Sequence, residues 1–596
     1  MLGINIAGEF LDLSPGTTAQ LERVSPFFND DSLAGEYSLP LSFPYTPRNA
    51  RLLGLPNHYY TQRIKKKIAA SVFDKNNFAY KGELVIETAE LDVNDITKSA
   101  INGFFVTGVS SFFQQVKNKK LKELSLGGVR NFTWTSDVPA SPVKGFWQYV
   151  HDSLDGLMEY SFCPIRNEKW SGTSDVGTPE WMNKLADDGN LDFQNNYTTL
   201  APQVSLKYIL EQIFEEHGWT FSADMGDTQW ATIFIPSFFA VTWQKVILTG
   251  VDPWYAYSPL TNITMNLQNH VPPEMLITSM IIALRKRYNW GFEFDSGKKV
   301  CRMFAIKDLA KDGVRKDWTK YMAAKWLSDF SEDEKVFAFH NTIDSNDEMS
   351  SAPDFDKVTF GDPVAMYADL PAATVDNFNL VVFCWKENKF YQNRYNEDDT
   401  IYDWQLYADN IYDYEPEENN SDIDTECSTM PVYKTYFRTD GDPTDFYISV
   451  PYCLQEGNWE NKEGDFVPWG FRTLFHRGRV YEANPSDVMG TVQYPCLTSI
   501  AFTITQEEAD LAWSNVYAHS FDGNDLGIIK YWWADTLKYL KQSDVISGQL
   551  KLPRNELLNF VWSDVILLKN VPYIMQKITE IIPYDGAVEV EMRRIG

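Results

Sequence analysis

The histidines are the side chains of this chain best suited to acid–base catalysis near neutral pH, and they lie far apart in the sequence. His217 follows two glutamates and directly precedes Gly218, which predicts a position at the end of a helix, where a cation is favourable, rather than a catalytic role. The other histidines show no catalytic or metal-binding spacing: His58, His151, His270, His340, His476 and His519.

The carboxylates are numerous, with 82 Asp and Glu residues, so pairs at the separation used by glycoside hydrolases must occur by chance. No pair is marked out as an acid and a nucleophile. The sequence also lacks the Gly-x-Ser-x-Gly elbow, the His-Glu-x-x-His zinc motif, the phosphate-binding loop, the dinucleotide-binding glycine motif and the protein-kinase set. We assign no catalytic residue and expect no enzyme activity, with a glycan or peptidoglycan hydrolase as an alternative.

The cysteines show no Cys-x-x-Cys pair and no histidine at metal-binding spacing: Cys163, Cys301, Cys384, Cys427, Cys453 and Cys496. This pattern favours free, buried thiols over disulfides or a structural metal. The acidic stretch between 331 and 429 lacks the ligand spacing of an EF-hand and indicates a solvated surface. "TDGDPTD", Thr439 to Asp445, is a better cation candidate, although a turn is favoured there. We predict no metal ligand and no cofactor.

Two tryptophans lie beside acidic residues, Trp459 in "EGNWENKEGDF" and Trp469 shortly after it. Exposed aromatic rings of this kind would suit a glycan-binding adhesin, which is a further alternative. Buried or interface aromatic residues are the more common case and are favoured here.

The charge balance is 53 Lys and Arg against 82 Asp and Glu, a formal net charge of −29. On average this field repels phosphates and anionic membranes, so a general nucleic-acid binder is disfavoured. The same sign would suit a conduit through which DNA passes without sticking. No signal peptide and no run of about 18 apolar residues is present, so we expect synthesis in a cytoplasm and no stable membrane insertion.

Two segments share one order of helix, cap and strand. In "SLKYILEQIFEEHGWTFSAD" Ser205 is a candidate N-cap, Gly218 suits a left-handed residue after the helix, and the apolar stripe is Leu206, Ile209, Leu210, Ile213 and Phe214. In "PPEMLITSMIIALRKRYNWGFEFDSGKK" Asn289 replaces the glycine and the stripe is Ile277, Met280, Ile281 and Leu284. Asparagine is the next-best residue for that conformation, so we interpret the pair as an internal duplication.

The two ends of the chain alternate as strands do. "YKGELVIETAEL" and "GGVRNFTWTSDV" predict strands in the first 134 residues, and "SSFFQQVKNKKLKEL" a helix between them. Near the other end, a hairpin is predicted about Lys569-Asn570 and a closing strand in "GAVEVEMRRIG". "DLGIIKYWWADTLKYLKQ" predicts an aromatic helix with Ile529, Trp533, Leu537 and Leu540 on one stripe.

The stretch "YSLPLSFPYTP" alternates like a strand yet contains prolines, which cannot donate to a ladder. Pro40 and Pro44 are four residues apart, so both remove donors from the same edge, and we predict a strand that pairs on one side only. Either the prolines protect an ordinary edge strand against aggregation, or they restrict pairing to the one edge that is used in assembly. Pro47 and Pro56 are expected to bracket a rigid basic loop, "RNARLLGL".

Together these patterns predict a β-rich α+β chain of several domains. The predicted division is an N-terminal β-barrel-like domain (1–144), an α+β domain (145–265), a second α+β or barrel-like domain with acidic loops (266–425) and a C-terminal β-rich domain with one aromatic helix (426–596).

The order of these parts resembles the baseplate-hub or tail-tip proteins of tailed bacteriophages and contractile injection systems. The resemblance is carried by "LSFPYTPRNARLLGLP", the helix ending in "HGWTF", "VPPEMLITSMIIALRKRYNWGFEFD" and the terminal "ILLKNVPYIMQKITEII…VEVEMRRIG". It implies tube-like β-barrel domains with smaller α+β domains inserted or appended. It further implies a homotrimeric ring in the virion that adapts the tail tube to the tip and through which DNA passes. It also implies tail-tube or distal tail proteins, a tape-measure protein and a central spike or fibre as partners.

Overall fold

The computed structural model describes residues 2–595 with the exception of 26, 28–35, 39–40, 55–66, 76, 91, 93–98, 108, 134–144, 156–157, 173–179, 187–188, 193–195, 197, 227, 250–253, 296–297, 330–335, 343, 349–358, 363, 365–366, 385–388, 397–400, 410–412, 415–420, 431, 437–446, 461, 463, 483–491, 500–527 and 543–544. The predicted β-rich, multi-domain α+β class is confirmed. No helix in the described part of the chain is both long and apolar enough to cross a bilayer.

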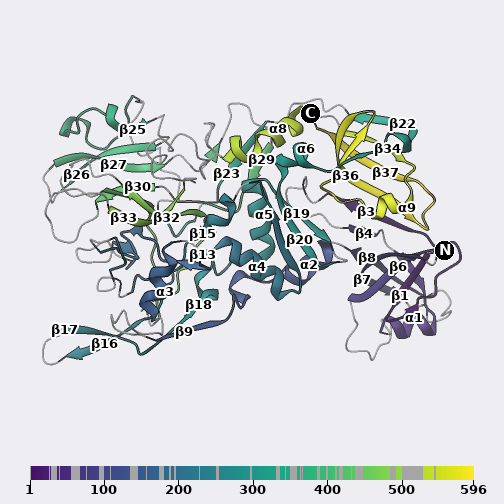
Figure 1. The fold of residues 1–596 in the computed structure, drawn as a ribbon, viewed down its shortest axis with the longest axis horizontal. Helices are drawn as coiled ribbons and strands as arrows, with labels where there is room; N and C mark the ends of the chain where they lie inside the picture. The colour runs from purple at the N-terminus through teal and green to yellow at the C-terminus, as the bar shows by residue number, and fades with distance from the viewer. Residues whose placement is uncertain are drawn as a thin grey trace.

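The largest sheet has 14 strands and is built from both ends of the chain. Figure 1 shows these first strands (purple) and last strands (yellow) together at one end of an elongated molecule. The N-terminal strands are β1 (Leu2–Ile6), β2 (Glu9–Phe10), β3 (Ala19–Val24), β4 (Glu36–Ser38), β5 (Leu41–Pro44), β6 (Lys67–Asp74), β7 (Asn77–Glu90) and β8 (Ala100–Thr107). The later strands are β21 (Arg315–Asp317), β22 (Met322–Asp329), β34 (Val545–Leu550), β35 (Val565–Leu568), β36 (Val571–Ile582) and β37 (Val588–Arg594).

The order of the main path is β2-β1-β6-β7-β8-β4-β3-β36-β37-β34-β22. β5 pairs with β8, β35 with β36 and β21 with β35. The joint between the two halves is the antiparallel pair β3–β36, which runs from Ala19 opposite Ile582 to Val24 opposite Lys577. The predicted four-domain division stays a prediction, and this sheet joins strands from three of its parts.

Each half of the large sheet curves around a hydrophobic core of its own. The N-terminal half encloses Leu2, Ile4, Leu84 and Phe105, among others. The C-terminal half encloses residues of β35 to β37 together with Trp318. The short helices α1 (Pro47–Leu52), α6 (Leu309–Asp312), α8 (Ala534–Gln542) and α9 (Arg554–Leu558) lie beside these halves.

The expectation of a basic loop after Pro47 is wrong, because residues 47–52 form helix α1. Pro47 stands in the first turn, where a missing N–H costs nothing, and the Thr46 side chain accepts from the Asn49 amide at 3.1 Å. The basic residues are neutralised, since Arg48 pairs with Asp12 at 2.8 Å and Arg51 with Glu9 at 2.5 Å.

The segments between the two halves form smaller sheets around two further cores. Their helices are α2 (Val109–Val116), α3 (Phe146–Ser153), α4 (Leu206–Glu216) and α5 (Ile277–Tyr288). One sheet consists of β14 (Thr220–Asp224), β20 (Val300–Ala305) and β19 (Trp290–Asp295). Two further sheets are the pair β9 (Val129–Thr133) and β18 (Asn262–Asn266) and the pair β16 (Gln244–Thr249) and β17 (Trp254–Pro259). Another sheet consists of β10 (Tyr160–Ser161), β13 (Gln203–Ser205), β15 (Ile233–Ile235), β32 (Leu474–Glu482) and β33 (Val492–Thr498). A four-stranded sheet consists of β12 (Trp181–Met182), β11 (Ile165–Asn167), β31 (Tyr447–Cys453) and β30 (Val432–Tyr436). A three-stranded sheet consists of β28 (Asp413–Tyr414), β23 (Phe337–His340) and β29 (Ser421–Asp424). A second four-stranded sheet consists of β24 (Thr359–Phe360), β25 (Leu380–Cys384), β26 (Lys389–Asn396) and β27 (Ile401–Asp409).

The two duplicated units are confirmed as helix, left-handed residue and strand. Gly218 has φ +69° after α4, and Asn289 has φ 54° after α5. The predicted stripe residues of both helices are buried. Their strands β14 and β19 flank β20 in one three-stranded sheet, so the units lie in the inserted part and outside the large sheet. The C-terminal hairpin is also confirmed, with Lys569 and Asn570 at positive φ.

Candidate functional site

The large sheet presents a polar face opposite its two cores. In β37, Val588, Val590 and Met592 are buried while Glu589 and Glu591 are exposed, because successive side chains of a strand point to opposite sides. The same alternation in β3, β36 and β34 adds to this polar face, which includes Gln20, Glu22, Lys577, Thr579, Glu589, Glu591, Ser547 and Gln549. It also includes one exposed apolar side chain, Ile581, opposite Gln20.

This polar face is hollowed into a groove of about 850 Å³ that crosses five strands, from β3 to β22. Glu22, Glu589 and Glu591 line it, together with Lys325 and Lys577. Lys577 Nζ lies 3.3 Å from Glu22 Oε2, so one of the two bases is neutralised within the groove. A polyanion in this groove would face more carboxylates than lysines. Its binding would release few counterions, so the groove would bind it weakly.

Buried charges between the two cores hold the halves together at the β3–β36 joint. Glu580 is fully buried and pairs with Arg554 of α9. The Arg554 guanidinium stacks over Tyr80 and Tyr584, with 5.4 and 5.1 Å to the ring centroids. Burial, and then the Glu580 charge, hold the pKa of Tyr80 well above its ordinary value. Asp74 accepts from the Tyr584 amide at 3.2 Å, so this joint links β6, β7, β36 and α9.

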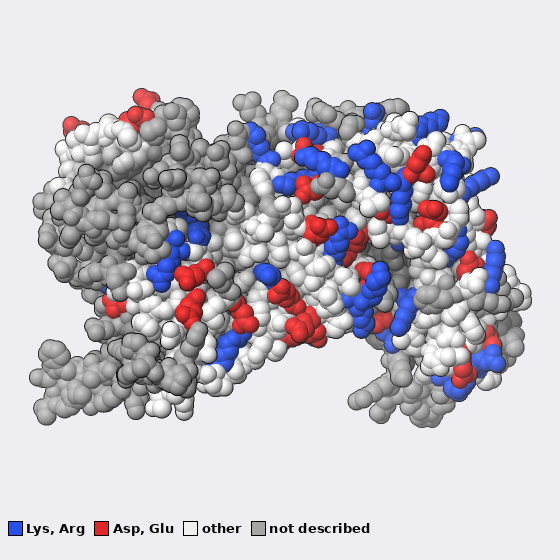
Figure 2. Space-filling view, viewed as in Figure 1, with Lys and Arg blue, Asp and Glu red and all other residues white. Residues whose placement is uncertain are grey.

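The acidic average of the chain does not describe its whole surface. Residues 298–325 carry nine Lys and Arg against three Asp. Figure 2 shows Lys and Arg gathered over α6, α8 and the strands β22, β34 and β37. Arg315, Lys320 and Lys325 are exposed members of this basic surface. Of these three residues only Lys325 also lines the groove, so the C-terminal half of the large sheet has a locally basic surface outside the groove.

A cysteine and a histidine that the sequence separates by more than 300 positions meet in the inserted part. His476 Nε2 lies 2.9 Å from Ser161 Oγ and 3.3 Å from Cys163 Sγ, and all three residues are buried. Burial raises the pKa of the Cys163 thiol and lowers the pKa of His476 to about 3.

The hydrogen bonds of His476 also oppose catalysis by this group. Its Nδ1 accepts from the Gly478 amide at 2.9 Å, so the neutral ring carries its proton on Nε2 and donates toward Ser161 or Cys163. A general base would need a bare Nε2 facing the nucleophile. The arrangement therefore satisfies buried polar atoms and supports no acyl transfer.

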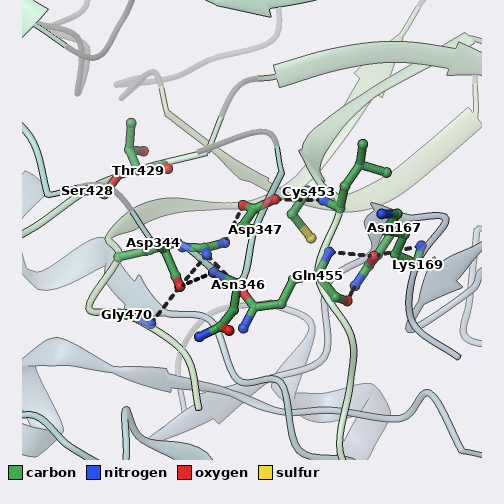
Figure 3. Close-up of polar contacts among 12 residues, drawn as sticks. Asn167, Lys169, Asp344, Asn346, Asp347, Ser428, Thr429, Cys453, Gln455 and Gly470 are labelled. Carbon is green, nitrogen blue, oxygen red and sulfur yellow. Dashed lines mark hydrogen bonds and ion pairs between the residues drawn. The ribbon is translucent and has the colours of Figure 1, made fainter. Parts of the chain in front are cut away.

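Figure 3 shows Asp344, Asp347 and Gly470 of a second buried polar cluster. At its centre is Arg472, whose side chain is 1% exposed. Its Nη2 lies 2.6 Å from Asp344 Oδ2, and its Nη1 lies 2.8 Å from Asp347 Oδ2. The same carboxylates accept from backbone amides, Asp344 from Gly470 at 2.6 Å and Asp347 from Leu454 at 2.8 Å. These bonds hold three loops together. Because the carboxylate oxygens of both acids already bind groups of the chain itself, the cluster is not a candidate ligand site.

The other residues singled out in the sequence fall in structural positions. His217 is the C-cap of α4, with Nδ1 2.7 Å from the Ile213 carbonyl, as predicted. Trp469 is buried. All six cysteines are free and buried, also as predicted. The loop Thr439–Asp445 lies outside the described residues. Within those residues, no three His, Cys, Asp or Glu side chains come together in a way that could hold a metal ion.

The joint and the groove were missed at the sequence level, although one signal was present. Glu580 alternates in step with Ile578 and Ile582, so it shares their apolar face. A carboxylate on the buried face of a strand requires a partner, which is Arg554 here. Arg472 had no comparable local signal.

The sequence matches no protein-family model and no curated protein. Among the solved structures that match it, two prophage tail proteins overlap at low similarity. One is the 43 kDa tail protein of prophage MuSo2 from Shewanella oneidensis, with 8% identity and a TM-score of 0.32 over 99% of this chain and 97% of that chain. The other is the prophage tail protein gp18 from Listeria monocytogenes EGD-e, with 7% identity and a TM-score of 0.30 over 99% of this chain and 94% of that chain. Overlaps this low do not establish a shared fold.

Proposed function

We propose that this chain is a structural hub subunit of a bacteriophage tail tip. Three copies form a ring in the virion that joins the tail tube to the tip, and the polar faces of their large sheets line the channel through which DNA passes. The order of sequence segments that resembles baseplate-hub proteins motivates this function. The main structural support for this function is the large sheet, which packs one face against two hydrophobic cores and presents the polar groove on the other.

The sheet has the properties that a channel wall needs. One face is fixed to two hydrophobic cores, so the wall is rigid, and the other is polar and hollowed. The groove carries carboxylates that exceed its lysines, which suits passage of DNA without retention. The two halves, joined at β3–β36, would place two similar wall segments per chain around a threefold axis.

The oligomeric state tests the ring directly. Native mass spectrometry and analytical ultracentrifugation of the purified chain should give three times its 68.6 kDa mass, alone or in the presence of tail-tube protein. A strict monomer under both conditions, with no affinity for tube proteins, would refute the function.

The channel surface needs a separate experiment. Glu22→Lys, Glu589→Lys and Glu591→Lys together should make the assembled ring retain double-stranded DNA at low salt. A matched control reverses three exposed acids outside the groove, Asp376→Lys, Asp422→Lys and Asp424→Lys. If the groove variant and the control retain DNA equally, the polar face does not line the channel.

A further inference from the structure

The end of the large sheet at β22 carries an exposed leucine. Leu327 is 73% exposed, the highest value among the large apolar side chains in the described part of the chain. It lies directly opposite Ser547, which is opposite Glu591, so Leu327 belongs to the polar face. It also lines the rim of the groove beside Lys325. An apolar side chain this exposed at a sheet edge is typical of a contact with another chain.

The opposite end of the sheet, at β1 and β2, carries an apolar pocket. Phe10 is 47% exposed and packs edge-on against Phe73, with ring centroids 5.2 Å apart. Gly3 lies directly opposite Phe73 and leaves space above the strand for the Phe10 ring. Together with Leu13 and Pro583 these residues line a pocket of about 520 Å³, and none of the described residues in its wall is charged.

Register places the pocket and the leucine on the same face. Glu22 is opposite Tyr37 in β4, and the pairing continues through Val106 and Glu83 to Ala69 in β6. Ala69 and Phe73 are an even number of residues apart in β6, so they share a side of the strand. The leucine and the pocket therefore lie at opposite ends of one side of the sheet. Between them Val106 of β8 is buried beneath α2, so this side is not polar along its whole length.

We propose that Leu327 of one copy inserts into the Phe10–Phe73 pocket of the next copy of this chain. A closed ring of identical chains uses a head-to-tail contact, in which one end of each copy meets the other end of its neighbour. The contact presupposes the ring proposed above and names the anchor that closes it. Its partner is a second copy, because the anchor and the pocket are the two ends of one face in the same chain.

Disulfide trapping tests this contact, because all six native cysteines are buried and give little background. Leu327→Cys and Phe10→Cys are made in separate chains, and the two proteins are mixed under oxidising conditions. The mixture should give covalent dimers, while either variant alone should give none. A chain that carries both substitutions should give linked species up to the full ring. As a matched control, Val375→Cys, which replaces a valine that is 66% exposed in the short 3-10 helix Val375–Asn377, outside the large sheet, should form no link with Phe10→Cys.

Loss of the anchor should also weaken assembly. Leu327→Asp should raise the apparent dissociation constant of the oligomer at least about tenfold, and Val375→Asp should leave it unchanged. If Leu327→Cys alone forms dimers, the contact is two-fold and the proposal is wrong. If the wild type forms a ring but the mixture does not link, the anchor is wrong while the ring stands. A monomeric wild type would overturn the proposed function itself.

Discussion

Replacing Arg472 by methionine should open the loops that it holds. Arg472, Asp344 and Asp347 have side chains that are 1%, 6% and 4% exposed, so the substitution leaves two carboxylates buried without their cation. Removal of one partner from a buried ion pair typically costs about 3–5 kcal/mol. Since about 1.4 kcal/mol is a tenfold change in an equilibrium, local opening should become more frequent by roughly 100-fold or more.

Hydrogen exchange can measure this opening at named amides, which suits a chain too large for a single two-state transition. The Gly470 amide donates to Asp344 and the Leu454 amide donates to Asp347, so both should lose protection in the Arg472→Met protein. Amides of β36, in the large sheet, should not change.

An exposed ion pair provides the control. Arg51 Nη2 lies 2.5 Å from Glu9 Oε2, but these side chains are 63% and 48% exposed. Such surface pairs contribute about 0–1 kcal/mol, so Arg51→Met should change protection little. If Arg472→Met exchanges no faster than Arg51→Met, the buried carboxylates are not held by the arginine and the reasoning fails.

Three further predictions concern other parts of the chain. Burial lowers the pKa values of His270 and His476 to about 3, so the unfolded chain binds more protons than the folded one between about pH 6.5 and pH 3. Stability should therefore fall as the pH is lowered through that window, and His476→Asn should reduce the fall when local opening of β32 is measured by hydrogen exchange. The raised pKa of the buried Cys163 thiol predicts no labelling by iodoacetamide in the native protein up to pH 9, and a labelled peptide in the folded state would contradict it. Pro44→Val should increase off-register association, seen as larger species by light scattering, and unchanged assembly would count against gatekeeping at that edge.

The one-sided strand shows what proline spacing can predict. The Tyr45 amide donates to the Ser99 carbonyl at 3.1 Å, so odd-numbered residues of β5 direct their N–H groups toward β8. Even-numbered residues, Pro44 among them, therefore face the other edge, as the sequence predicts. Helix α1, which follows, was not predicted, because a proline is common both in loops and in the first turn of a helix. The hydrogen bond that identifies the helix start, from the Asn49 amide to the Thr46 side chain, is seen only in the structure.

The duplicated units were predictable because their signals are local. An apolar stripe, an N-cap and a left-handed residue all lie within about 20 positions, and each depends on nearby backbone geometry. Asn289 adds a contact that no local rule predicts, since its side chain donates to the Trp532 carbonyl at 2.9 Å. That bond ties the second unit to the aromatic segment at 529–533, which is a π-helix rather than a regular α-helical stripe.

The joint of the large sheet could not be predicted, because alternation in β3 says which face is buried but not which strand lies beside it. Its partner β36 is more than 500 residues away, and only the register from Ala19 to Val24 reveals it. This long-range pairing also makes the proposed channel wall inseparable from either end of the chain. A truncation before 545 would remove β34 to β37 and leave β3 as a bare edge, so the wall is a property of the whole chain and not of a C-terminal module.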